Sequence, residues 1–137
     1  MATVDTSVII STYNNPEWLE KVLWSYEFQA YKKFEVVIAD DGSDENTKQL
    51  ICRLEKEVSY PIQHIWHEDN GFQKTIILNK ATVASKGDYL VYSDGDCIAR
   101  KDFLETHINF REKGFFLSGG YFKLPMNNIR AGCNNLL

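Results

Sequence analysis

The sequence has little of what membrane proteins and nucleic-acid-binding proteins need. No stretch approaches the roughly 20 apolar residues of a membrane span, so we expect no integral membrane segment in the sequence as given. Its 15 Lys and Arg against 19 Asp and Glu give a net charge of −4, without a basic stripe to neutralise a nucleic-acid backbone. No apolar signal-peptide region follows Met1. A cytoplasmic protein is expected, with peripheral attachment to the inner face of a membrane left open.

The sequence also has few cysteines and lacks the glycine-rich motifs that bind phosphates. The three cysteines, Cys52, Cys97 and Cys133, are an odd number without a C-x-x-C spacing, which favours a reducing compartment over a disulfide framework. There is no G-x-x-x-x-G-K-[ST], and no G-x-G-x-x-G follows the first predicted strand. The sequence therefore argues against a P-loop or a dinucleotide-binding site. With 44% hydrophobic residues over 137 positions, the composition is that of one globular domain.

Apolar runs and helical periods alternate along the chain. Unbroken β-forming runs predict strands, and apolar residues at helical spacing predict the helices between them. The predicted strands are 7–12, 34–39, 61–67, 89–93 and 115–118. The predicted helices begin at Pro16, at Ser43 or Asp44, within 72–86, and near Asp102, the last one ending at Gly114. This order predicts right-handed crossovers and a mainly parallel sheet.

The predicted strand at 89–93 ends in a pair of carboxylates. Its apolar run, Tyr-Leu-Val-Tyr, is typical of a strand buried on both faces, and Asp94-Gly95-Asp96 stops that run. Two carboxylates one residue apart repel each other, so Mn²⁺ or Mg²⁺, which prefer oxygen ligands, would stabilise them. An Asp-x-Asp triplet also occurs by chance in solvated loops. The metal hypothesis therefore depends on the position of this triplet at a strand end.

Three polar loops follow predicted strands and should meet at one edge of a parallel sheet. They are 11–14, 40–43 and 94–96. Such a rim would suit a nucleotide: Tyr13 could stack on a base, and Asp40 or Asp41 could accept a hydrogen bond from a base or a ribose. Asp94 and Asp96 could hold a metal on a diphosphate, which does not need a glycine cradle.

Several other conspicuous residues are interpreted as structural. We expect Trp18, Trp24 and Phe28 on the apolar face of the first helix, packed on the sheet. His64 and His67 do not predict a zinc site, because residues three apart on a strand point to opposite faces and no cysteine has zinc-site spacing.

Taken together, the motifs form an ordered set. They are 7–14 (Ser-Val-Ile-Ile-Ser-Thr-Tyr-Asn), 34–43 (Phe-Glu-Val-Val-Ile-Ala-Asp-Asp-Gly-Ser), Asn70-Gly71, Leu78-Asn79-Lys80-Ala81 and 87–96. Over roughly the first 110 residues this set resembles the nucleotide-sugar-binding half of family 2 glycosyltransferases. Gly71-Phe72-x-Lys74 and the Asp-Gly-Asp-Cys ending are similar to galactosyltransferase-like or polysaccharide-polymerase-like members. The resemblance implies an α/β fold of the GT-A (Rossmann-like) type, with α/β/α layers around a mainly parallel sheet.

The resemblance also implies roles for individual residues. Asp96 would ligate Mn²⁺ or Mg²⁺ on the donor diphosphate with Asp94 beside it, and Asp41, or next to it Asp40, would read the base. The remaining donor-site residues would be Ser11, Thr12, Tyr13 and Asn14 at the base and ribose, Lys74 near the diphosphate and Asn79 at the donor pocket. Thr12 stands where many members have proline, and Gln73 stands where relatives often have arginine.

The expected activity is inverting, metal-dependent transfer of a sugar from a nucleotide-diphospho-sugar to a glycan, polysaccharide or lipid-linked acceptor. Among the possible donors, the resemblance favours a UDP-sugar. The family's catalytic base lies well downstream of the Asp-x-Asp, so we name none. We expect a donor domain at 1–120 and an incomplete acceptor-side region at 121–137. Exposed apolar residues there, Tyr121 and Phe122, would then favour self-association.

Two alternatives remain beside the glycosyltransferase hypothesis. The chain could be a noncatalytic nucleotide-sugar or metal-binding module, a fragment without the acceptor site. A sugar-phosphate nucleotidylyltransferase shares the general architecture, but it needs a Gly-rich, Arg-bearing loop after the first strand, and 11–14 does not supply one.

Overall fold

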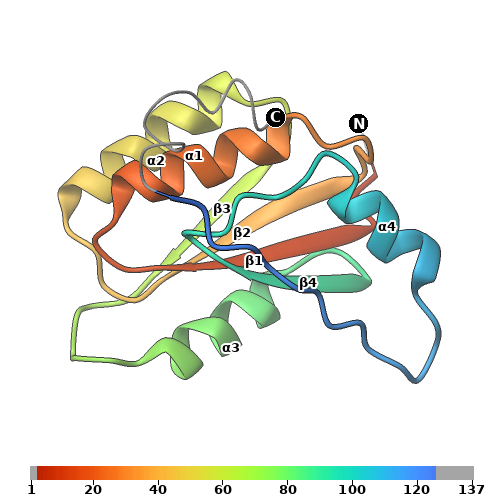
Figure 1. Cartoon of the computed structure of the whole chain (residues 1–137). Helices are drawn as coiled ribbons and strands as arrows, with labels where there is room; N and C mark the ends of the chain where they lie inside the picture. The colour runs from red at the N-terminus through yellow and green to blue at the C-terminus, as the bar shows by residue number, and fades with distance from the viewer. Residues whose placement is uncertain (1–2, 126–137) are drawn as a thin grey trace.

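Strands and helices alternate along the part of the chain that is described, residues 3–125 of a computed structural model (Figure 1). The strands are β1 (Thr6–Thr12), β2 (Phe34–Asp40), β3 (Ile62–Trp66) and β4 (Tyr89–Asp94). The helices are α1 (Pro16–Glu27), α2 (Glu45–Glu57), α3 (Lys74–Ala84) and α4 (Phe103–Phe110). The alternation predicted from the sequence is therefore confirmed for these eight elements. Within residues 3–125, no helix combines the length and apolarity that crossing a membrane requires.

The four strands form one sheet in the order β3-β2-β1-β4, and every pair is parallel. Parallel neighbours need crossover connections, and helices α1, α2 and α3 supply them. The register pairs Thr12 with Asp40 and Ser11 with Asp94. The loops that follow β1, β2 and β4 consequently start at the same edge of the sheet, as the sequence predicted.

Helices cover both faces of the sheet, which gives the expected three layers. Alternate residues of β1 point to opposite faces, so Val8 and Ile10 pack on one side and Ile9 on the other. The first side holds the larger core, with α1, α2 and Leu104 of α4, and the second holds Ile77 and Ala81 of α3. Figure 1 shows α1 and α2 above the sheet and α3 below it.

The expectation that the strand at 89–93 is buried on both faces is wrong. In the described residues β4 is an edge strand, only Val91 in it is buried, and Tyr92 is 53% exposed. An apolar run cannot distinguish a central strand from an edge strand, because the difference depends on which other elements pack around it.

Three further predictions about the elements are corrected. Helix α4 ends at Phe110 and not at Gly114, and residues 115–118 form no strand, since they lie exposed without a neighbouring strand to pair with. Phe28 follows α1 and is half exposed, whereas Trp18 and Trp24 are partly buried and Trp24 packs on the larger core. Of 121–137, the described part, 121–125, is exposed without regular secondary structure, and 126–137 lies outside the described residues.

Helices α1, α2 and α4 begin after the predicted N-cap residues, but only the cap of α2 uses its side chain. Pro16 occupies the first turn of α1, where its missing N–H costs nothing, and Asn15 precedes it without a side-chain capping hydrogen bond. Of the two predicted caps for α2, Asp44 is the N-cap, and its carboxylate accepts a hydrogen bond from the Asn46 N–H. These caps fix where the loops after β1 and β2 end and the helices begin.

Candidate functional site

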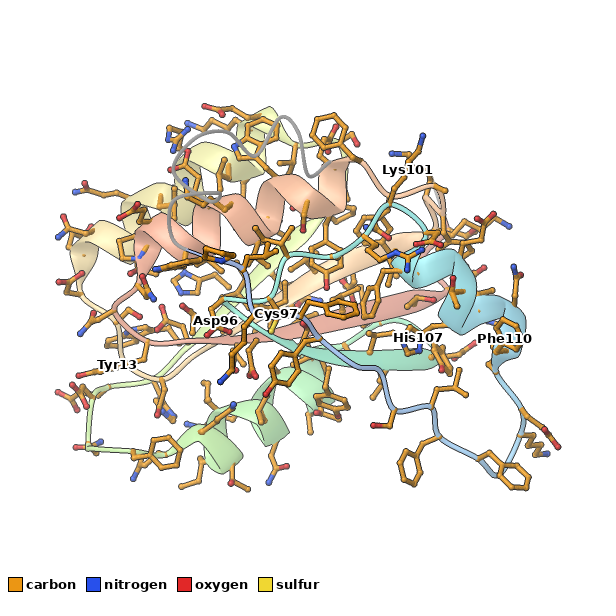
Figure 2. The ribbon with its side chains drawn as sticks, viewed as in Figure 1. Tyr13, Asp96, Cys97, Lys101, His107 and Phe110 are labelled. Atoms are coloured by element: carbon orange, nitrogen blue, oxygen red, sulfur yellow. The ribbon has the colours of Figure 1, made fainter. Side chains whose placement is uncertain are left out.

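A cavity of about 480 Å³ lies at the carboxyl edge of the sheet. Ligands in open α/β sheets collect at this edge, beyond the ends of the strands. In Figure 2, Tyr13 and Asp96 lie toward this end of the sheet. The cavity is lined by Ser11, Thr12, Tyr13, Asn15, Asp41, Asp69, Gly71, Phe72, Lys74, Ile77, Asp94, Gly95 and Asp96.

Asp94 is the last residue of β4, and two donors hold one of its oxygens. Its Oδ1 accepts hydrogen bonds from Lys74 Nζ at 2.8 Å and from Ser11 Oγ at 2.7 Å. These donors, Lys74 first and then Ser11, outweigh burial and lower the pKa of Asp94 below its ordinary value. The Gly95 N–H bonds to the Ser11 carbonyl at 2.8 Å, and a Cβ at Gly95 would lie only 2.9 Å from that oxygen. Glycine therefore lets the turn after β4 lie close to β1.

Asp94, Asp96 and Cys97 place donor atoms within 4.8 Å of one another. Both carboxylates are exposed, so they keep free lone pairs for a ligand. Burial and the neighbouring Asp96 raise the pKa of the Cys97 thiol, and its soft sulfur is not a ligand that Mn²⁺ or Mg²⁺ prefers. The donor set is thus mainly hard oxygen and fits Mn²⁺ or Mg²⁺.

Asp41 follows β2 and is held from two sides. His67 Nε2 lies 2.6 Å from its Oδ1, and the backbone N–H of Gln73 donates to its Oδ2 at 2.9 Å. The Asp41 side chain is 9% exposed and the His67 side chain 10%. Asp41 therefore presents a carboxylate of fixed orientation to the cavity.

Asp40, the other carboxylate of the pair, has a structural role. It is fully buried, and its oxygens accept the Ser43 N–H at 2.8 Å and contact His64 Nε2 at 2.7 Å. Burial alone would raise the pKa of Asp40, but the hydrogen bonds from His64 and Ser43 outweigh it and lower the pKa. Of the two aspartates predicted as candidates for reading the base, Asp41 lines the cavity and Asp40 does not.

Asp69 lines the cavity and was not predicted. It accepts a hydrogen bond from the Tyr13 hydroxyl at 2.7 Å and from the Gly71 N–H at 3.1 Å. The same bonds lower the pKa of Asp69, and the bond to Asp69 raises that of Tyr13. The sequence did carry a signal, because Asp69 lies in a polar loop that follows a predicted strand.

Seven of the ten predicted site residues line the cavity, namely Ser11, Thr12, Tyr13, Asp41, Lys74, Asp94 and Asp96. Three do not. Asn14 has a left-handed backbone (φ 46°), and its side chain accepts the Asp44 N–H at 2.8 Å, which joins the loops after β1 and β2. Asn79 is exposed on α3, and Asp40 is buried as described above. The lining residues that were not predicted as site residues are Asn15, Asp69, Gly71, Phe72, Ile77 and Gly95.

Comparison with known proteins matches the family model described as "Glycosyl transferase family 2" to residues 7–127. An uncharacterized glycosyltransferase of Rickettsia conorii is 31% identical over 113 residues, which is 81% of this chain and 18% of the relative. The glycosyltransferase AglE of Haloferax volcanii is 31% identical over 125 residues, which is 89% of this chain and 40% of AglE. The chain thus spans less than half the length of these relatives.

Solved structures give the same result for the fold. TarS of S. aureus, residues 1–349 in complex with UDP-GlcNAc, superposes with a TM-score of 0.65 and 26% identity over 78% of this chain and 31% of that one. The mannosyltransferase PcManGT of Pyrobaculum calidifontis, in complex with GDP-Man and Mn²⁺, superposes with a TM-score of 0.66 and 24% identity. The match covers 79% of this chain and 32% of that one. The architecture around the cavity is that of the GT-A fold. Because the family model covers most of the sequence, from the first strand past the last described residue, this chain belongs to glycosyl transferase family 2.

Proposed function

We propose that the cavity binds a UDP-sugar and that the protein transfers its sugar to a glycan, polysaccharide or lipid-linked acceptor. One observation carries this proposal. Asp41, Lys74, Asp94 and Asp96 come from three separate segments of the chain and line one cavity, although up to 55 positions separate them. A cavity with a fixed carboxylate at one strand end and an exposed acidic pair with a lysine at another suits a ligand with a polar base and a diphosphate.

The base end of the proposed ligand would lie on the β1 and β2 loops. Asp41 is an acceptor that is nine-tenths buried, so it can take an N–H from the edge of a base. Tyr13 is half exposed at the cavity and offers its ring for stacking on that base. Ser11 and Thr12 would frame the ribose. We propose uracil as the base because UDP-GlcNAc is the ligand of the related TarS structure.

The diphosphate end would lie at β4 and the start of α3. Asp94 and Asp96 would hold Mn²⁺ or Mg²⁺, which, when bound, neutralises charge on the diphosphate leaving group. Lys74 offers a second positive charge beside them, since its ammonium already lies 2.8 Å from Asp94 Oδ1. Asn79, exposed on α3 and not in the cavity lining, is not placed in contact with the donor in this proposal.

The proposed reaction is an inverting displacement. An acceptor hydroxyl oxygen forms a bond to the anomeric carbon, the bond from that carbon to the diphosphate oxygen breaks, and the nucleoside diphosphate leaves. The hydroxyl proton passes to a carboxylate base. The carboxylates that follow Asp96 are Asp102, Glu105 and Glu112, and none of them lines the cavity. We therefore assign the base to none of the residues within 3–125.

Titration calorimetry of UDP with and without Mn²⁺ tests the donor site, using Asp96→Ala and the matched control Asp88→Ala. Asp88 is an exposed aspartate at the opposite end of β4. We expect binding that needs Mn²⁺, a loss of at least about 100-fold in Asp96→Ala, and no change in Asp88→Ala. Equal affinity in EDTA, or in Asp96→Ala, would contradict the proposed metal-bridged site.

The second candidate is a noncatalytic nucleotide-sugar-binding module. The absence of a downstream carboxylate from the cavity lining within residues 3–125 favours it. The two candidates differ in turnover. Slow Mn²⁺-dependent hydrolysis of UDP-sugars, lost in Asp96→Ala, would support an enzyme, whereas tight binding without hydrolysis or transfer to any acceptor would support the module.

A further inference from the structure

Asp41 and His67 are neighbours because the sheet register brings them together. The last pair of residues in the register between β2 and β3 is Asp40 with Trp66. The residues that follow these two strands, Asp41 and His67, are therefore neighbours. His67 Nε2 lies 2.6 Å from Asp41 Oδ1, and both side chains are nine-tenths buried. His67 does not itself line the cavity, so any effect on a ligand passes through Asp41.

A third residue fixes the tautomer of His67. Lys80 Nζ on α3 lies 3.2 Å from His67 Nδ1. An ammonium group can only donate, so Nδ1 is the acceptor and the imidazole carries its hydrogen on Nε2. We assign this tautomer from the hydrogen-bond partners. The Nε2–H then donates to Asp41, which leaves the carboxylate with an N–H on each oxygen, one from His67 and one from Gln73.

This arrangement restricts what Asp41 can recognise. With a donor already on each oxygen, the carboxylate is held in one orientation, and its remaining lone pairs can accept but not donate a hydrogen bond. Uracil presents an N–H at ring position 3, whereas cytosine presents a bare ring nitrogen there. A fixed acceptor at this place discriminates between the two bases, because the unmatched base leaves buried polar groups unpaired.

We propose that Lys80 and His67 form a positioning relay that orients Asp41, so that selectivity for uracil over cytosine depends on His67. The relay rests on the proposed donor site and adds to it a residue that touches no ligand. A second aspartate–histidine pair, Asp40 of β2 and His64 of β3, provides the comparison. His64 holds Asp40 at 2.7 Å in the same way, but Asp40 does not line the cavity.

The test is calorimetry of UDP and CDP with Mn²⁺ on the whole chain and on three variants. His67→Leu removes the donor, and we expect UDP affinity and the UDP-to-CDP ratio each to fall by about tenfold. His67→Gln keeps an N–H donor, and we expect it to recover most of that ratio. His64→Leu removes the equivalent buried bond at Asp40, and we expect a lower melting temperature with an unchanged ratio.

The outcomes separate the relay from the donor site itself. If the unmodified chain binds UDP with Mn²⁺ but His67→Leu keeps its affinity and ratio, the relay is overturned and the donor site stands. Should the unmodified chain bind neither nucleotide, the donor site fails, and the relay with it. A ratio that falls equally in His64→Leu would mean that only general loosening of the sheet edge matters, which also overturns the relay.

A measurement on the unmodified chain covers the case in which His67→Leu does not fold. Nitrogen-15 NMR of the histidine side chains reports the tautomer directly. We expect His67 to carry hydrogen on Nε2 and to accept at Nδ1, and its signals to move on addition of UDP with Mg²⁺ more than those of His64. Hydrogen on Nδ1 with a bare Nε2, or no response to UDP that binds, would overturn the proposal.

Discussion

The two acidic strand ends of the cavity are built in opposite ways. At the end of β2, Asp40 and Asp41 are buried, and each has a histidine and a backbone N–H as partners. At the end of β4, Asp94 and Asp96 are exposed, and Lys74 and Ser11 hold only one oxygen of Asp94. Pairs of aspartates that look alike in the sequence therefore differ in how much of their bonding capacity is already used.

The difference follows from the position of each strand in the sheet. Strand β2 lies between β1 and β3, so its end is surrounded by protein groups that must be satisfied internally. Strand β4 is at the edge within the described residues, and its end faces solvent. A buried carboxylate with one donor on each oxygen keeps a fixed orientation and free lone pairs for a further N–H, whereas exposed carboxylates with fewer partners suit a metal ion and a diphosphate.

The largest expected effect comes from disturbing the packing at the buried end. Gly42 has φ +93°, and a Cβ there would lie 2.6 Å from the Asp69 Cα. Gly42→Ala should lower the free energy of unfolding by about 3 kcal/mol, from backbone strain and from displacement of the loop that carries Asp69. Urea denaturation measures this change.

Gly71→Ala is the matched control for Gly42→Ala. Gly71 has a similar φ of +85° but no atom within 4 Å of its added Cβ, so only the strain of about 1–2 kcal/mol should remain. Equal losses in the two variants would show that close packing of this loop on Gly42 does not stabilise the buried end.

An intermediate effect is expected from Asp40→Asn, which should lower the free energy of unfolding by about 2 kcal/mol near pH 7. Burial raises the pKa of Asp40, but the bonds from His64 and Ser43 outweigh this and hold it below the ordinary value of 3.8. A depressed folded pKa means that the ionised carboxylate stabilises the fold above that ordinary value, and that this stability is lost as the pH falls through the folded pKa.

The difference in stability between the unmodified chain and Asp40→Asn should therefore shrink once the pH is lowered below the ordinary carboxyl pKa of 3.8. Urea denaturation at several pH values measures it. Asp94→Asn is the control from the exposed end, where the pKa is also lowered but the side chain is 53% exposed, so the change should be smaller. A larger acid dependence for Asp94 than for Asp40 would reverse the comparison.

The smallest effect on stability is expected at the exposed end, from Lys74→Met. Its ion pair with Asp94 joins side chains that are 39% and 53% exposed, so stability should change by about 0.5 kcal/mol or less. The pKa of Asp94 should nevertheless rise toward its ordinary value, because Lys74 is the main cause of the lowered pKa. Carbon-13 NMR titration of the carboxylates measures this rise, and Lys48→Met, at an exposed position of α2, is the control. An unchanged Asp94 pKa would show that Ser11 alone sets it.

Much of the fold could be predicted because its signals are local. The apolar runs of β1 and β2, the cap at Asp44 and Pro16 at the start of α1 each act within a few residues. The parallel order followed from the alternation of elements. The predicted strand at 115–118 and the helix end at Gly114 were wrong, since a short apolar run or a glycine predicts such features only when a neighbouring element is there to pack against.

By itself the sequence determined the alternation of strands and helices, the edge at which the polar loops meet, and most of the residues that line the cavity. Only the tertiary structure decided which of Asp40 and Asp41 faces the cavity, that Asp69 joins it, and that His67 holds Asp41. These choices depend on distances between residues 26 to 56 positions apart. Such distances are set by sheet register and burial, and no local pattern of residues encodes them.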